Sequence, residues 1–150
     1  MSLQDQLMAD MKDSMRAKEA GKKKLTVIRM VRSAIKNIEI NEKRELNDAD
    51  IVEVLAKEVK QRRDAIPDYE NANRPDIVES LLSEIDILME YLPKQLSEEE
   101  IRSLVKEVIS EVGGSSPNDM GKVMGKLMPK VKGKADGKLV NQIVKELLVN

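Results

Sequence analysis

The sequence predicts an all-α protein, in which an N-terminal domain of about four helices is followed by a small three-helix domain. Apolar residues make up 41% of the 150 residues, and they are almost all aliphatic, because the chain has no Phe or Trp. They recur at spacings of three and four residues, which places them along one face of a helix. Charged residues supply a further 35% of the chain, as expected for the solvent-exposed sides of amphipathic helices.

Two helices are predicted before residue 45. The apolar face of the first, which Gly21 should end, contains Leu3, Leu7, Met8, Met11 and Met15. The apolar face of the second contains Leu25, Ile28, Val31, Ala34, Ile35 and Ile38. Its opposite side carries Arg29, Arg32, Lys36, Glu39 and Arg44.

The third and fourth helices are predicted around a turn at residues 71–75. Asn47 and Asp48 offer oxygens that can cap the third helix, and Pro67 is expected to kink or end it. Its apolar positions are Ile51, Val54, Leu55, Val59 and Ile66. The fourth helix, which Pro93 should close, carries Ile77, Leu81, Leu82, Ile85, Leu88, Met89 and Leu92.

A domain boundary is predicted at Pro93. A residue before proline is pushed away from helical geometry, and a new helix start follows at once. In that start, the Ser97 hydroxyl and the Glu100 carboxylate can each accept the other residue's backbone N–H, which is the capping box. The expected domains are therefore residues 1–93 and 94–150.

Three short helices are predicted in the second domain. The first has apolar residues from Ile101 to Val112 and ends at the glycine pair 113–114. The second starts at Ser116-Pro117 and gives way after Pro129 to a basic loop, residues 130–137. The last helix covers the apolar repeat of residues 139–148.

The absence of both cysteine and histidine limits the chemistry. The chain can have no disulfide and no thiolate metal site, and it lacks the commonest general base near neutral pH. Independent catalysis is therefore disfavoured, and no catalytic residue, metal or cofactor is expected. Residues 1–15 contain no signal-peptide apolar run and no stretch approaches the length of a membrane span, so a reducing cytoplasm is the expected location.

One segment is distinctly basic. Residues 116–138 contain six lysines and two aspartates, a net charge of +4 in a chain whose total is -1. Lysines at four-residue spacing line one side of a helix, so a backbone-phosphate surface is the hypothesis and an ordinary solvated face is the alternative. The six lysines are Lys122, Lys126, Lys130, Lys132, Lys134 and Lys138.

The glycines of this segment need a reason. Gly121 and Gly125 interrupt a helix and are expected to allow close packing of a neighbouring helix. Gly133 and Gly137 are expected to be exposed and to allow a nucleic-acid backbone to approach closely.

A second basic cluster lies near the end of the third helix, where Arg62 and Arg63 join Lys57 and Lys60. Since no aromatic residues are interleaved, any RNA contact here would be to phosphate or sugar. Arg62 and Arg63 therefore join the candidate RNA-binding residues, and a solvated face is again the alternative.

Four segments resemble those of the YqeY family: residues 60–66 (KQRRDAI), 91–96 (YLPKQL), 119–124 (DMGKVM) and 132–137 (KGKADG). The C-terminal part is also similar to the helical tail domain of the B subunit of the glutamine-dependent tRNA amidotransferase, a tail that helps to grip tRNA. The resemblance implies two helical domains and tRNA as a partner. It does not carry over catalysis, because the amidotransferase active site lies in a larger domain without a counterpart here.

Three hypotheses follow. The leading one is a tRNA-binding accessory protein that uses the basic C-terminal surface. The first alternative is a protein–protein adaptor whose aliphatic, methionine-bearing N-terminal helices dock a partner. The second is an accessory to glutamine-dependent carbon–nitrogen ligation in tRNA amidation, which needs an external catalytic chain and a protein partner in tRNA aminoacylation or amidation.

Overall fold

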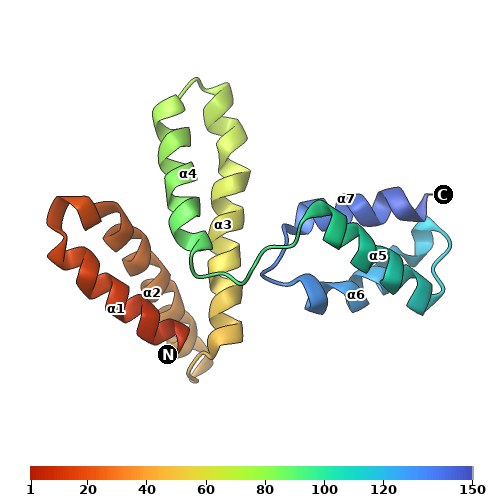
Figure 1. The fold of residues 1–150 in the computed structure, drawn as a ribbon, viewed down its shortest axis with the longest axis horizontal. Helices are drawn as coiled ribbons and strands as arrows, with labels where there is room; N and C mark the ends of the chain where they lie inside the picture. Colours follow the sequence, from red (N-terminus) through yellow and green to blue (C-terminus); the bar gives the residue numbers. More distant parts are fainter. Residues whose placement is uncertain (150) are drawn as a thin grey trace. The chain divides into compact units, whose positions relative to one another are not determined.

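A computed structural model describes residues 1–149, and these residues form helices and no strand (Figure 1). The prediction of an all-α fold is confirmed. The elements, in which η marks a short 3-10 helix, are α1 (Leu3–Arg16), η1 (Lys18–Gly21), α2 (Lys22–Glu42), α3 (Asp48–Asn71), α4 (Pro75–Met89), α5 (Glu98–Val112), η2 (Pro117–Asp119), α6 (Met120–Val131) and α7 (Gly137–Leu148).

The chain divides into two compact units, Met1–Leu92 and Pro93–Asn150. Each unit has a hydrophobic core of its own. The first core is built from α1 to α4 and is centred on Leu7, Ile28, Ile51, Leu55 and Leu88. The second is built from α5 to α7 and is centred on Ile101, Val105, Leu127, Ile143 and Val144.

A tight turn joins α1 to α2. Gly21 is buried in this turn, and a Cβ at that position would overlap the backbone carbonyl of Ser14. The first helix ends at Arg16, before the predicted Gly21, and Gly21 instead lets the two helices approach closely. Met15, expected on the apolar face of α1, is 50% exposed.

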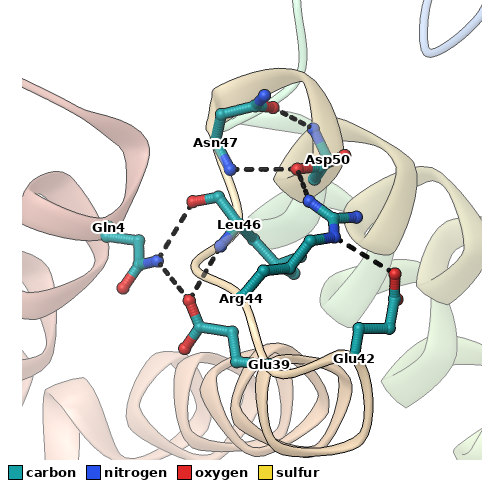
Figure 2. A network of polar contacts seen from close by, with 7 residues as sticks. All are labelled: Gln4, Glu39, Glu42, Arg44, Leu46, Asn47 and Asp50. Carbon is teal, nitrogen blue, oxygen red and sulfur yellow. Dashed lines mark hydrogen bonds and ion pairs between the residues drawn. The ribbon is translucent and has the colours of Figure 1, made fainter.

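The loop between α2 and α3 is fixed by side chains on both sides of it (Figure 2). Leu46 is buried, and its backbone N–H donates to the Glu39 carboxylate, which also accepts from the Gln4 amide of α1. Asn47 and Asp50 form a capping box at the start of α3. The predicted cap at Asn47 is therefore confirmed.

The α3–α4 hairpin departs from two expectations about where helices end. Pro67 neither ends the helix nor marks a boundary, since α3 continues to Asn71. A proline removes one intrahelical hydrogen bond, but Pro67 is exposed, so water can satisfy the carbonyl that loses its donor. Helix α4 also ends earlier than predicted, because it stops at Met89 and does not reach Pro93.

Tyr91 follows α4 and ties it to α1. Its side chain is buried, and its hydroxyl donates a short hydrogen bond to the Asp10 carboxylate. Burial, together with this carboxylate partner, raises the pKa of the Tyr91 phenol above its ordinary value, so the hydroxyl keeps its proton.

The three-helix unit begins with the predicted capping box between Ser97 and Glu100, which is confirmed. Gly113 closes α5 in the left-handed conformation, with a φ of 65°. Asp136 caps α7 by accepting the Lys138 backbone N–H at 3.1 Å. Contrary to expectation, α6 runs through Pro129 to Val131, so the basic loop starts at residue 132.

Among residues 1–149, no helix combines the length and the apolar character that a membrane span requires.

Candidate nucleic-acid interface

The candidate interface is the lysine surface of the three-helix unit, which we define as Lys122, Lys126, Lys130, Lys132, Lys134 and Lys138. Because α6 extends to Val131, the first three lysines lie on one continuous helix. Lys132 and Lys134 lie in the loop that follows, and Lys138 is in the first turn of α7. All six residues are exposed.

The core dictates where the α6 lysines point. Val123, Leu127 and Val131 are fully buried and repeat every four residues. Each lysine precedes one of these residues and is therefore rotated by about 100° from the buried face. The same repeat that anchors α6 thus lines its lysines along one exposed edge.

Glu111 of α5 lies against this edge. Its carboxylate is 2.7 Å from the Lys126 ammonium and 3.9 Å from that of Lys130. The hydrogen bond from Lys126, helped by the two positive charges, holds the pKa of the Glu111 carboxyl below its ordinary value. The lysine surface is therefore partly neutralised at its centre by an acid that sequence reasoning missed, because the partners lie on different helices.

The basic loop is held by the segment that enters the unit. The Gln95 side-chain amide donates at 2.8 Å to the carbonyl of Gly133 and at 2.8 Å to that of Pro93. The Leu96 N–H donates to the Lys134 carbonyl at 2.8 Å. Gln95 and Leu96 belong to the YLPKQL segment, which was the only sequence signal for this positioning role.

Gly133 departs from the expectation of an exposed glycine, since it is buried. Its φ of 74° is the left-handed conformation that favours glycine, and its carbonyl is occupied by Gln95. Gly133 therefore shapes the basic loop from within and does not present its backbone to a ligand.

The other three glycines have open space around them. A Cβ at Gly121, Gly125 or Gly137 would meet nothing within 4 Å. Gly121 and Gly125 are exposed, so the expected close packing of a neighbouring helix against them is wrong. What they do leave is bare backbone beside the α6 lysines.

Arg62 is not available to RNA, which corrects its place among the candidates. Its side chain is 8% exposed, and its guanidinium lies 2.8 Å from the Glu58 carboxylate and 3.9 Å from that of Glu84. Its Nε atom is buried without a hydrogen-bond partner. Arg62 is a structural cation of the N-terminal unit, whereas Arg63 is exposed and contacts the Met89 sulfur at 3.9 Å.

Asp119 supports the turn that precedes α6. Its carboxylate accepts the backbone N–H groups of Ser115 at 2.9 Å and Ser116 at 3.2 Å. These bonds hold the pKa of the Asp119 carboxyl below its ordinary value, and the Lys122 charge adds to the effect. In the described part of the chain, no three acidic residues come together in a way that could hold a metal ion.

Fold and surface together define a class: a two-unit, all-helical protein with an exposed lysine surface on its three-helix unit. The chain belongs to the YqeY family, since the family model described as Yqey-like protein matches residues 4–148. The resemblance seen in four short segments is thereby confirmed.

Curated relatives carry the name Altered inheritance of mitochondria protein 41, mitochondrial. The protein of Kluyveromyces lactis is 37% identical over 116 residues, which are 75% of this chain and 61% of the relative. That of Lachancea thermotolerans is 36% identical over 115 residues, 75% of this chain and 60% of the relative. The chain thus spans about three fifths of these relatives. Neither the family description nor the relatives' name assigns a catalytic activity.

These names correct the expected location. A cytoplasmic protein was predicted, yet the curated relatives are named as mitochondrial proteins. The physical reason is that the absence of cysteine does not distinguish one reducing compartment from another.

Proposed function

We propose that this protein binds tRNA, or a complex that carries tRNA, as an accessory protein without catalytic activity of its own. The observation that carries the proposal is the lysine surface, in which one edge of α6, a fixed loop and the first turn of α7 present six exposed lysines within residues 122–138. Lysine side chains displace the counterions of a phosphate backbone, which gives binding that is strong at low salt.

The local geometry favours a backbone over a base. The described surface has no aromatic side chain for base stacking, while Gly121 and Gly125 leave helix backbone open beside the lysines. The similarity of this unit to the tail of the amidotransferase B subunit supports tRNA as the RNA concerned, and a role beside tRNA amidation is the finer form of the same proposal.

The test is binding of the full chain to tRNA across a salt series, with an unrelated structured RNA of similar size in parallel. Reversing the charge of Lys122, Lys130 and Lys134 should weaken tRNA binding and flatten the salt dependence by about 2 to 3, because each lost contact removes roughly 0.7 to 0.9 from the slope. Lys126 is left in place because it is hydrogen-bonded to Glu111.

The matched control reverses Lys12, Lys106 and Lys145, which are exposed and lie outside the lysine surface. It makes the same change in net charge and should leave the slope nearly unchanged. An equal loss of tRNA affinity in both variants would mean that binding depends only on the overall charge of the protein and not on the lysine surface. Unchanged binding in the first variant would overturn the proposal and favour a protein-binding adaptor.

A further inference from the structure

The most basic segment of the chain lies outside the lysine surface. Residues 16–36 contain eight lysines and arginines and one acid, Glu19, a net charge of +7. The segment covers the end of α1, the η1 turn and most of α2. Its charge exceeds the +4 of residues 116–138 and belongs to the other unit.

The helix geometry gathers these charges on one face of α2. Val27, Val31 and Ile35 are buried in the core and fix the inner side of the helix. Lys22, Arg29 and Lys36 recur every seven residues on the opposite, exposed side. At 1.5 Å per residue this row is about 21 Å long, and it points away from the core.

We define the α2 basic face as Lys22, Arg29, Arg32 and Lys36. None of the four takes part in an ion pair in the part of the chain that the structure describes. Elsewhere in the segment, Arg16 pairs with Asp13 at 3.0 Å and Lys24 pairs with Glu90 at 3.1 Å. The positive charge of the face is therefore uncompensated by direct pairs.

The acids nearest to the face are engaged elsewhere. Glu39 follows Lys36 by one helical turn, but its Oε2 accepts from the Gln4 amide at 3.2 Å and from the Leu46 N–H at 2.9 Å (Figure 2). Glu58 of α3 is bound to the buried Arg62 at 2.8 Å. Both carboxylates serve the fold of the N-terminal unit and leave the α2 cations to an external anion.

The surroundings of the face suit a sugar–phosphate backbone. A hollow of about 200 Å³ on one side is lined by Arg32 and Lys36 together with Gln4 and Glu39. A second, more open hollow on the other side is lined by Arg29 with Ser33 and Asn37. Arginine and lysine bind phosphate, and hydroxyl and amide groups bind phosphate and ribose oxygens.

The packing of α2 argues against a membrane surface as the partner of this face. A helix that lies on a membrane needs a continuous apolar side next to its basic one. The apolar side of α2 is buried in the protein core, and Met30 is the one large apolar side chain within residues 22–36 that is exposed, at 45%. Anionic lipid would therefore gain charge contacts without apolar burial.

We propose that the α2 basic face is a second RNA-backbone surface, which binds phosphates and sugars without reading bases. The inference rests on the proposed function in taking RNA as the partner, but it concerns different residues on a different unit. With no aromatic side chain on the face, binding there is insensitive to base sequence.

The experiment replaces Lys22, Arg29 and Lys36 by glutamine in the full chain and measures tRNA affinity over a salt series. We expect weaker binding and a salt dependence that flattens by about 2 to 3, equivalent to three lost phosphate contacts. The control replaces Lys12, Lys106 and Lys145 by glutamine, which removes the same charge from exposed positions outside both surfaces. It should leave the slope unchanged.

The outcomes separate this inference from the proposed function. If the α2 variant binds like the control while the lysine-surface variant is impaired, the α2 inference is overturned and the proposed function stands. If the reverse holds, the α2 face is the RNA surface and the lysine surface is not. Vesicles containing anionic lipid are tested in parallel, and selective loss of vesicle binding with unchanged tRNA binding would also overturn the inference.

Discussion

At the scale of single residues, the glycines of this protein serve opposite purposes. Gly21 is required, because an added Cβ would overlap the Ser14 backbone. Gly125 has open space at the same atom and lies within a helix. The cost of a methyl group should therefore differ in sign between the two positions.

We expect Gly21→Ala to lower the free energy of unfolding by about 1–3 kcal/mol, the usual cost of overpacking. Gly125→Ala should raise the stability of the three-helix unit by roughly 0.5–1 kcal/mol, since alanine restricts the unfolded chain and favours helix. Urea denaturation followed by circular dichroism measures both. Equal effects of the two substitutions would contradict the packing assigned to Gly21.

Glu111 makes stability depend on pH in a defined direction. Its pKa is lower in the folded protein than its ordinary value because of Lys126, so folding favours the ionised carboxyl. This contribution is present above the ordinary pKa and is lost as the pH falls through the lowered one. The stability difference between the native protein and Glu111→Gln should therefore shrink as the solution is acidified below the ordinary carboxylate range. A difference that does not change with pH would argue against the ion pair.

The same substitution tests the lysine surface from the opposite side. Glu111 competes with phosphate for Lys126 and Lys130, so Glu111→Gln should tighten tRNA binding and steepen its salt dependence by up to about one contact's worth, roughly 0.7 to 0.9. Glu107→Gln, an exposed substitution on the same helix, provides the control for net charge. Identical effects of the two would mean that only overall charge matters.

At the scale of elements, helix starts follow local side-chain chemistry. Ser97 begins α5 through reciprocal bonds with Glu100, at 3.1 and 3.3 Å. We expect Ser97→Ala to destabilise the three-helix unit by about 1 kcal/mol. Ser103→Ala, at an exposed position inside the same helix, should be neutral or slightly stabilising. Thermal unfolding measures the stability of both variants. An equal loss of stability in both would mean that the cap does not contribute specifically to the stability of α5.

Helix ends at proline follow local chemistry less closely. Pro67 and Pro129 each lie inside a helix, although Pro67 was expected to kink or end its helix and a loop was expected after Pro129. Both are exposed, and the apolar repeats continue past Pro129 to the buried Val131. At Pro129, burial of Val131 offsets the lost hydrogen bond, which propensity alone does not reveal.

At the scale of the whole molecule, each core draws its residues from one unit. Leu55→Ala and Leu127→Ala remove fully buried side chains from the first and the second core, and each should cost about 2–5 kcal/mol. Hydrogen exchange should show lost protection chiefly in the unit that carries the substitution. Loss spread evenly over residues 1–149 in both variants would mean that the chain unfolds as one cooperative body.

Much of this protein follows from its sequence alone. The aliphatic repeats determine that it is helical and which face of each helix is buried, as at Leu55 and Val105, because helix periodicity is a local property, although Met15 on such a face is exposed. The caps at Asn47 and Ser97 are equally local, since each involves residues three positions apart. The family could also be recognised from four short segments, and the match of the family model to residues 4–148 confirms that assignment.

The tertiary structure decided which charges remain available. From the sequence, Arg62 and Lys126 are both candidate RNA-binding cations on a predicted helix. In the structure, Arg62 is buried between Glu58 and Glu84, whereas Lys126 is paired with Glu111. The structure likewise buries Gly133 and fixes its loop through Gln95, 38 positions earlier in the chain. These outcomes depend on partners brought together by packing between helices. Sequence spacing places a residue on its own helix, but only the packed fold sets what faces it.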